Sequence, residues 1–139
     1  MNTNNISALA LAYIGDAIFE LFVRHKVITA TPMSVNMLHK TAANYVNAEA
    51  QSKMYHALSA IATDEELAVL KRGRNAKSFT KPKNKNVSSY RHATGVEALF
   101  GYLYLNGDTI RLEYLFEVCA NCVNDDEVVS QNNGHNKGG

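Results

Sequence analysis

Apolar side chains recur at helical spacing along most of this chain, and short polar or helix-breaking stretches divide the pattern into segments. The spacing is helical rather than alternating, and the chain has only 2 Pro and 8 Gly, which disfavours an all-β sandwich. We therefore expect an all-α fold. The pattern predicts helices over residues 6–26, from 34 to about 58, from 64 into the basic residues after 70, over 89–105, and from 109 to about 124.

Local signals place several helix ends. Thr63, followed three residues later by Glu66, forms a capping box that predicts a helix start at Asp64. Asn106 and Gly107 predict a helix stop, and residues 81–86, which contain Pro82, predict a loop. Residues 129–139 have little to bury, so we expect the folded unit to span residues 1–128 and the remainder to be a disordered tail.

Two predicted helices are apolar on nearly every face. Residues 8–23 are interrupted only by Gly15, Asp16 and Glu20, and residues 93–105 carry a single charge, Glu97. Helices of this kind lie in protein interiors. A chain of 139 residues has little outer protein with which to cover two of them. We therefore expect a second copy of the chain to cover one side, so that the protein is a homodimer.

The carboxylates in these helices have no basic neighbour in their own segment, and an unpaired carboxylate is costly to bury. Gly15 lies beside Asp16, and further glycines, Gly95 and Gly101, flank Glu97. They would let the two helix backbones approach closely. Asp16 and Glu97 would then meet, and two carboxylates with hydroxyl or water neighbours suit Mg²⁺.

The same acidic residues also have an ordinary structural interpretation. Glu20 is better explained as a salt-bridge partner between helices or across a dimer. For Asp16 and Glu97 the pattern leaves two interpretations open. They form a metal site, or Asp16 bonds to a hydroxyl while Glu97 reaches an arginine at the rim. We expect His92, ahead of the Glu97 helix, to be exposed to water.

The net charge of +1 is the sum of two opposed regions. Residues 71–92 contain eight of the 14 Lys and Arg residues and no Asp or Glu, so the rest of the chain holds six basic residues against all 13 acidic ones. A polyanionic partner rewards such segregation, and we favour it over a merely solvated lysine-rich loop. The best candidates for phosphate contacts are Arg72, Arg74, Asn75, Lys77, Lys81, Lys83, Lys85 and Arg91.

Membrane and redox signals are weak. There is no apolar run of roughly 18 residues and no cleavable leader, so we expect neither membrane insertion nor secretion. Cys119 and Cys122 cannot form a disulfide framework and have no histidine at ligand spacing. We interpret them as small buried apolar side chains in a cytoplasmic protein.

Four segments resemble the ribonuclease III family and occur in the family's order. The sequence YIGDAIFEL at residues 13–21 resembles the signature helix, and VEALFGYLYL at 96–105 resembles a stretch of the last catalytic helix. The segments YVNAEAQ at 45–51 and KRGRNAKS at 71–78 resemble in particular the Mini-ribonuclease III branch, which has no double-stranded-RNA-binding domain. The resemblance covers roughly residues 9–116.

The resemblance implies a homodimeric, all-α endonuclease that hydrolyses double-stranded RNA with Mg²⁺, for which Mn²⁺ could substitute. Asp16 matches the aspartate of the family's GD pair and Glu97 the glutamate of its VEA triplet, so both are implied to be catalytic metal ligands. Full-size members have two more acids, where this chain has Ala12 and Thr94. Thr94 and Glu20 are candidate supporting residues. With so few charges, metal binding would be assisted by the scissile phosphate.

For the Mini-ribonuclease III branch the implied substrate is precursor 23S ribosomal RNA, and a ribosomal protein is a candidate accessory partner. The main alternative is a non-catalytic RNA-binding dimer of the same fold, and a more distant one is a helical homodimer that binds proteins. The joint presence of Asp16 and Glu97 favours the enzyme, because a purely structural relative has no reason to keep both acids in apolar helices.

Overall fold

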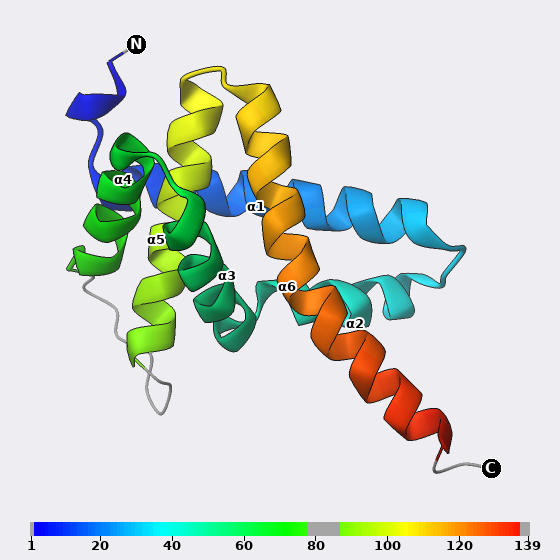
Figure 1. The fold of residues 1–139 in the computed structure, drawn as a ribbon. Helices are drawn as coiled ribbons and strands as arrows, with labels where there is room; N and C mark the ends of the chain where they lie inside the picture. Colours follow the sequence, from blue (N-terminus) through cyan, green and yellow to red (C-terminus); the bar gives the residue numbers. More distant parts are fainter. Residues whose placement is uncertain (1, 78–86, 137–139) are drawn as a thin grey trace.

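The computed structural model describes residues 2–77 and 87–136, with side chains described as far as Val123. Every regular element in these ranges is helical, which confirms the all-α prediction (Figure 1). After a short 3-10 helix, η1 (Thr3–Asn5), the helices are α1 (Ala8–Ala30), α2 (Val35–Val46), α3 (Ala48–Ile61), α4 (Asp64–Asn75), α5 (Val87–Leu105) and α6 (Thr109–Asn136).

Helix α5 lies at the centre of the molecule and packs against α1, α3 and α4, while α6 returns along α3 (Figure 1). Most of its middle is buried, as the apolar segment 93–105 predicts, and its residues Val96, Leu99 and Phe100 have no exposed surface, whereas Thr94 and Glu97 are half-buried. Phe100 packs edge to face on Phe19 of α1 at 5.3 Å between ring centroids, and Phe19 contacts Phe116 of α6 at 5.7 Å. These rings join three helices in one core.

Two local signals place helix ends correctly. The capping box at the start of α4 is present, because the Thr63 hydroxyl accepts from the Glu66 amide and the Glu66 carboxylate accepts from the Thr63 amide. Gly107 has a φ of +73°, which ends α5 and turns the chain into α6. The left-handed conformation suits glycine because no Cβ opposes it.

Two boundaries differ from the prediction. The single helix expected from residue 34 to 58 is two helices, because Asn47 leaves helical geometry with a ψ of 156° and its side chain accepts from the Ala50 amide to cap α3. Asparagine competes for backbone hydrogen bonds in this way. In addition, α6 passes its expected end near residue 124, so residues 129–136, expected to be disordered, are helical. Residues 124–136 contain no Pro and a helix already formed propagates readily.

The closest contact between helices is the crossing of α1 and α5 at two glycines. A Cβ added to Gly15 would fall on the backbone carbonyl of Glu97, and one added to Gly101 would clash with the Leu11 carbonyl. The predicted close approach at these glycines is confirmed. Gly95, expected to take part in it, instead faces α4, where an added Cβ would lie 2.7 Å from the Leu70 carbonyl oxygen.

A buried ion pair ties α6 to the start of α4. Glu66 is 4% exposed, and its two carboxylate oxygens accept from Arg111 at 2.8 and 2.9 Å. Arg111 also donates to the Ile61 carbonyl at 3.3 Å, so it spans the turn between α3 and α4. Its guanidinium holds the pKa of Glu66 below the ordinary value, against the opposing effect of burial.

Helix α1 is only half covered. Its inner side chains, which include Phe19 and Val23, are buried, whereas Tyr13, Leu21 and Ile28 are 84%, 63% and 64% exposed. No other helix in the described part of the chain covers this outer face, and its cover by a second copy stays a prediction. Among the described residues, no helix is long and apolar enough to cross a membrane.

We predict that Gly15→Ala lowers the free energy of unfolding by at least about 3 kcal/mol, because the new methyl group has to displace the backbone of α5. Urea denaturation measures the change. Gly107→Ala is the matched control, with nothing within 4 Å of its added Cβ, and only its positive φ should cost about 1 kcal/mol. Equal losses in the two variants would contradict the importance of the crossing.

Candidate functional site

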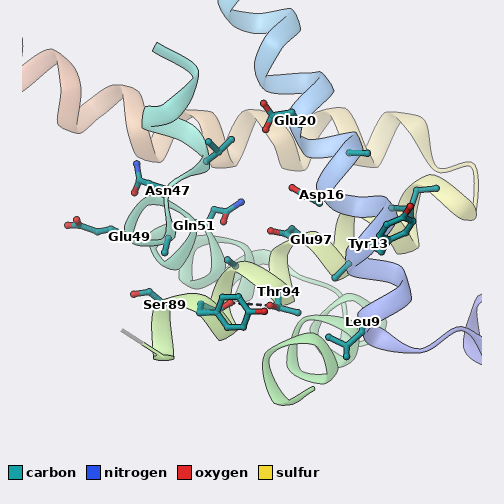
Figure 2. Close-up of a pocket in the computed structure, with 17 residues that line it drawn as sticks. Leu9, Tyr13, Asp16, Glu20, Asn47, Glu49, Gln51, Ser89, Thr94 and Glu97 are labelled. Carbon is teal, nitrogen blue, oxygen red and sulfur yellow. Dashed lines mark hydrogen bonds between the residues drawn. The ribbon is translucent and has the colours of Figure 1, made fainter. Parts of the chain in front are cut away.

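An open groove of about 1650 Å³ runs between α1, the junction of α2 and α3, and α5 (Figure 2). Helix α1 contributes Asp16 and Glu20, and α5 contributes Thr94 and Glu97. The break at Asn47 turns the start of α3 toward the groove, where Glu49 and Gln51 line the facing wall. The groove is thus bounded by segments that lie far apart in the sequence.

The glycine crossing places Asp16 next to Glu97. Gly15 contacts the backbone of Glu97, so the following residue, Asp16, lies beside the Glu97 side chain, and Figure 2 shows the two carboxylates facing each other. Asp16 is exposed and Glu97 is half-buried. The predicted meeting of these acids is therefore present in the structure.

Neither carboxylate has a hydrogen bond or ion pair with any residue whose side chain is described. The structural alternatives, a hydroxyl partner for Asp16 and a rim arginine for Glu97, are thus not found in that part of the chain. Burial, and secondly the charge of Asp16, raise the pKa of Glu97 from 4.5 to about 8. At neutral pH Glu97 therefore keeps its proton until a cation offsets both effects.

The other groove residues predicted for the site are engaged locally. Glu20 pairs with Arg24 one turn along α1 at 3.0 Å, so the expected pair between helices is instead a pair within one helix. The Thr94 hydroxyl donates to the Tyr90 carbonyl at 3.1 Å. Among the described residues there is no group of three or more His, Cys, Asp or Glu side chains that could hold a metal ion. Asp16 and Glu97 are accordingly a pair of carboxylates and not part of a larger cluster.

The basic residues lie outside the groove lining that is described. Arg72 donates to the Ile6 carbonyl at 3.1 Å, and Arg74 lies over the Tyr55 ring at 5.9 Å with its Nε donating to the Asn75 side chain. Lys77 and Arg91 are exposed. Lys81, Lys83 and Lys85 lie outside the described residues. Ser89 and Tyr90, at the end of the same segment, line the groove and connect it to the basic region.

A histidine cluster beside the groove has no local signal in the sequence. His92 stacks on Tyr55 at 4.5 Å between centroids, its Nδ1 lies 2.8 Å from the Ser52 hydroxyl, and the His56 ring is 4.8 Å away. The expectation that His92 is exposed to water is wrong, because α3 packs over it. Burial lowers the pKa of His92, and the charges of His56 and Arg74 lower it further.

The two cysteines divide between core and surface layers. Cys119 is fully buried on α6, as predicted, and burial raises the pKa of its thiol. Cys122 is half-buried and its Sγ lies 3.3 Å from the Val118 carbonyl, to which it donates.

Comparisons with known proteins agree with the geometry. The model of the ribonuclease III domain family matches residues 9–108. The chain is 42% identical to a Mini-ribonuclease 3 from Thermoanaerobacter sp. (strain X514), over 86% of this chain and 84% of the relative. It is 46% identical to a Mini-ribonuclease 3 from Enterococcus faecalis, over 82% of this chain and 88% of the relative. A crystal structure of a Fusobacterium nucleatum protein matches with a TM-score of 0.76 and 30% identity, over 84% of this chain and 93% of that one.

We predict that the protein without divalent metal loses stability as the pH rises from about 4.5 to about 8. Folded Glu97 keeps its proton up to a pKa of about 8, whereas its ordinary value is 4.5, so in this window the folded state binds more protons than the unfolded state. The contribution is complete below pH 4.5 and is lost as the pH rises through 8. Its size is on the order of 5 kcal/mol.

Urea denaturation in EDTA across this pH range measures the effect. Glu97→Gln should flatten the profile, because it removes the titrating group, and Glu117→Gln, an exposed carboxylate on α6, should leave it unchanged. A Glu97→Gln profile that falls as steeply as the original would show that another group titrates.

Proposed function

Because this chain belongs to the ribonuclease III family and is an endoribonuclease, we propose that it cleaves double-stranded RNA at a divalent-metal site formed by Asp16 and Glu97. The observation that carries the proposal is the pair of facing carboxylates, unpaired within the described part of the chain, in an open groove. A structural role would have supplied Glu97, the more buried of the two acids, with a partner, since an isolated buried carboxylate is costly.

The donor set fits Mg²⁺, and Mn²⁺ as a substitute, because carboxylate oxygens suit both hard cations. A cation between Asp16 and Glu97 would offset the burial and mutual repulsion that raise the pKa of Glu97. When bound, Mg²⁺ supplies Lewis acidity, which activates water and stabilises the oxygen leaving phosphorus. With two protein carboxylates, the remaining ligands come from water and from the scissile phosphate, so tight metal binding requires RNA.

The chain's own residues bind the substrate and orient it. Hydrolysis joins a water oxygen to phosphorus and releases the ribose 3′ oxygen, which leaves a 5′ phosphate and a 3′ hydroxyl. Glu97 has to give up its proton before it binds a cation, so cleavage should rise with pH near neutrality. The basic segment 71–92 would hold phosphates on the duplex beyond the groove, with Arg74, Lys77 and Arg91 as its described candidates.

The proposal extends to the natural substrate and the cellular compartment. The relatives are Mini-ribonucleases 3, and for this branch we propose precursor 23S ribosomal RNA as the substrate, in the cytoplasm, with a ribosomal protein as a candidate accessory partner.

The outer face of α1 supports a homodimer. Leu9, Tyr13, Ala17 and Leu21 follow one another at intervals of four residues and form an exposed ridge, and the first three of them also line the groove. A second copy covering this ridge would therefore border the groove that contains Asp16.

We predict that Asp16→Asn and Glu97→Gln each lower the cleavage of duplex RNA by at least about 10³-fold, because neither amide can replace a charged metal ligand. Cleavage is measured with Mg²⁺, with Mn²⁺ and with EDTA, and the product ends are mapped. Duplex affinity measured in Ca²⁺ should persist. Glu117→Gln on α6 is the control and should cleave normally. Full cleavage by either variant would remove that residue from the site, and absence of cleavage by the original protein would favour the non-catalytic RNA-binding dimer.

We predict that Tyr13→Arg raises the dimer dissociation constant by at least about 100-fold, because it places a charge in the centre of the ridge. Sedimentation equilibrium should give twice the 15.3 kDa chain mass for the original protein and a monomer for the variant at micromolar concentration. Ile110→Arg on α6 is the matched control, since both side chains are 84% exposed. A monomeric original protein, or a dimer that only Ile110→Arg disrupts, would refute this interface.

A further inference from the structure

Gln51 is a buried polar residue whose side chain has no partner among the described residues. It is 5% exposed, lies in the first turns of α3 and lines the groove. Figure 2 shows its amide directed across the groove toward Asp16 and Glu97. Two other buried polar side chains are satisfied, Glu66 by Arg111 and Thr3 by Asn106. Among the described side chains, the Tyr55 hydroxyl is the one fully buried polar group without a partner, so the Gln51 amide keeps its small exposed surface in the groove.

Packing alone does not explain an amide without a protein partner at this position. A leucine or methionine would fill the same wall, whereas the amide of Gln51 presents a donor and an acceptor to the groove and has no described protein partner for either. The amide end therefore fits a ligand that enters the groove. Its position on α3, opposite the two carboxylates, puts that ligand beside the reacting phosphodiester.

The chemistry of an amide narrows the choice of ligand group. It donates through nitrogen and accepts through oxygen, whereas a phosphate oxygen only accepts, and the described part of the chain supplies charged side chains for phosphate elsewhere. The ribose 2′ hydroxyl both donates and accepts, and it lines the wide minor groove of A-form RNA. DNA has no such group.

We propose that Gln51 binds a 2′ hydroxyl near the scissile bond and so contributes to the selection of RNA over DNA. This inference rests on the proposed function, since it requires a duplex in the groove. It makes Gln51 a specificity-determining residue that contacts substrate without taking part in the bond changes. The side chain is already held by burial, so binding costs little further ordering.

The test pairs a protein change with a substrate change. A short RNA duplex with one mapped cut is made with single 2′-deoxy substitutions at each nucleotide around that cut, and kcat/KM is measured for each. For the original protein, one position on each cleaved strand should lower kcat/KM about 10-fold. Gln51→Leu should lower kcat/KM for the all-RNA duplex by a similar factor, and the 2′-deoxy substitution at that position should then have no further effect.

Gln51→Met, which keeps the unbranched shape, repeats the measurement if the leucine variant does not fold. Asn121→Leu, which removes an exposed amide on α6, should respond to every 2′-deoxy substitution as the original protein does. Fully additive losses in the Gln51 variants would overturn the proposal, as would unchanged kcat/KM. Failure of the original protein to cut any duplex would instead refute the proposed function, so the two failures are distinguishable.

Discussion

The contact of Gly15 with the backbone of Glu97 is the constraint on which the rest of the molecule depends. Because neither Gly15 nor Gly101 has a Cβ, α1 and α5 cross at a separation that any side chain would prevent. The same contact sets the rotation of both helices about their axes. One rotation buries Phe19 against Phe100 on the inner side and turns Asp16 to face Glu97 on the groove side.

The close crossing also explains the electrostatics of the site. A wider separation would admit water and let Glu97 ionise freely, whereas here Glu97 is half-buried and close to a second acid, and its pKa is raised to about 8. The groove therefore holds an acid that gains from a cation, and it is open to a polyanion. No described Lys or Arg of residues 71–92 lines the groove, so the positive and negative regions of the chain do not cancel at this pair.

The remaining walls of the groove are positioned by contacts around α3. Asn47 ends α2 and caps α3, which directs Gln51 into the groove, and Arg111 holds the turn after α3 through Glu66 and the Ile61 carbonyl. Between these two ends of α3, Tyr55 stacks on His92 of α5. The stacking of His92 on Tyr55 joins α3 directly to α5, and the other two contacts fix the ends of α3 to α2 and α6. The position of the α3 wall is thus set mainly by contacts outside the groove.

The sequence by itself determined the helical class, the capping box at Thr63, the stop at Gly107 and the central burial of α5, and it made the meeting of Asp16 with Glu97 follow if their two helices pack together. These follow from periodicity, local hydrogen bonding and the cost of an unpaired acid in an apolar helix, all of which act over a few residues. Only the tertiary structure decided that Gly95 faces α4, that Glu66 pairs with Arg111, that His92 is covered by α3 and that Gln51 enters the groove. Such contacts join residues that are distant in the sequence and depend on which helix faces pack together, which local sequence patterns do not predict.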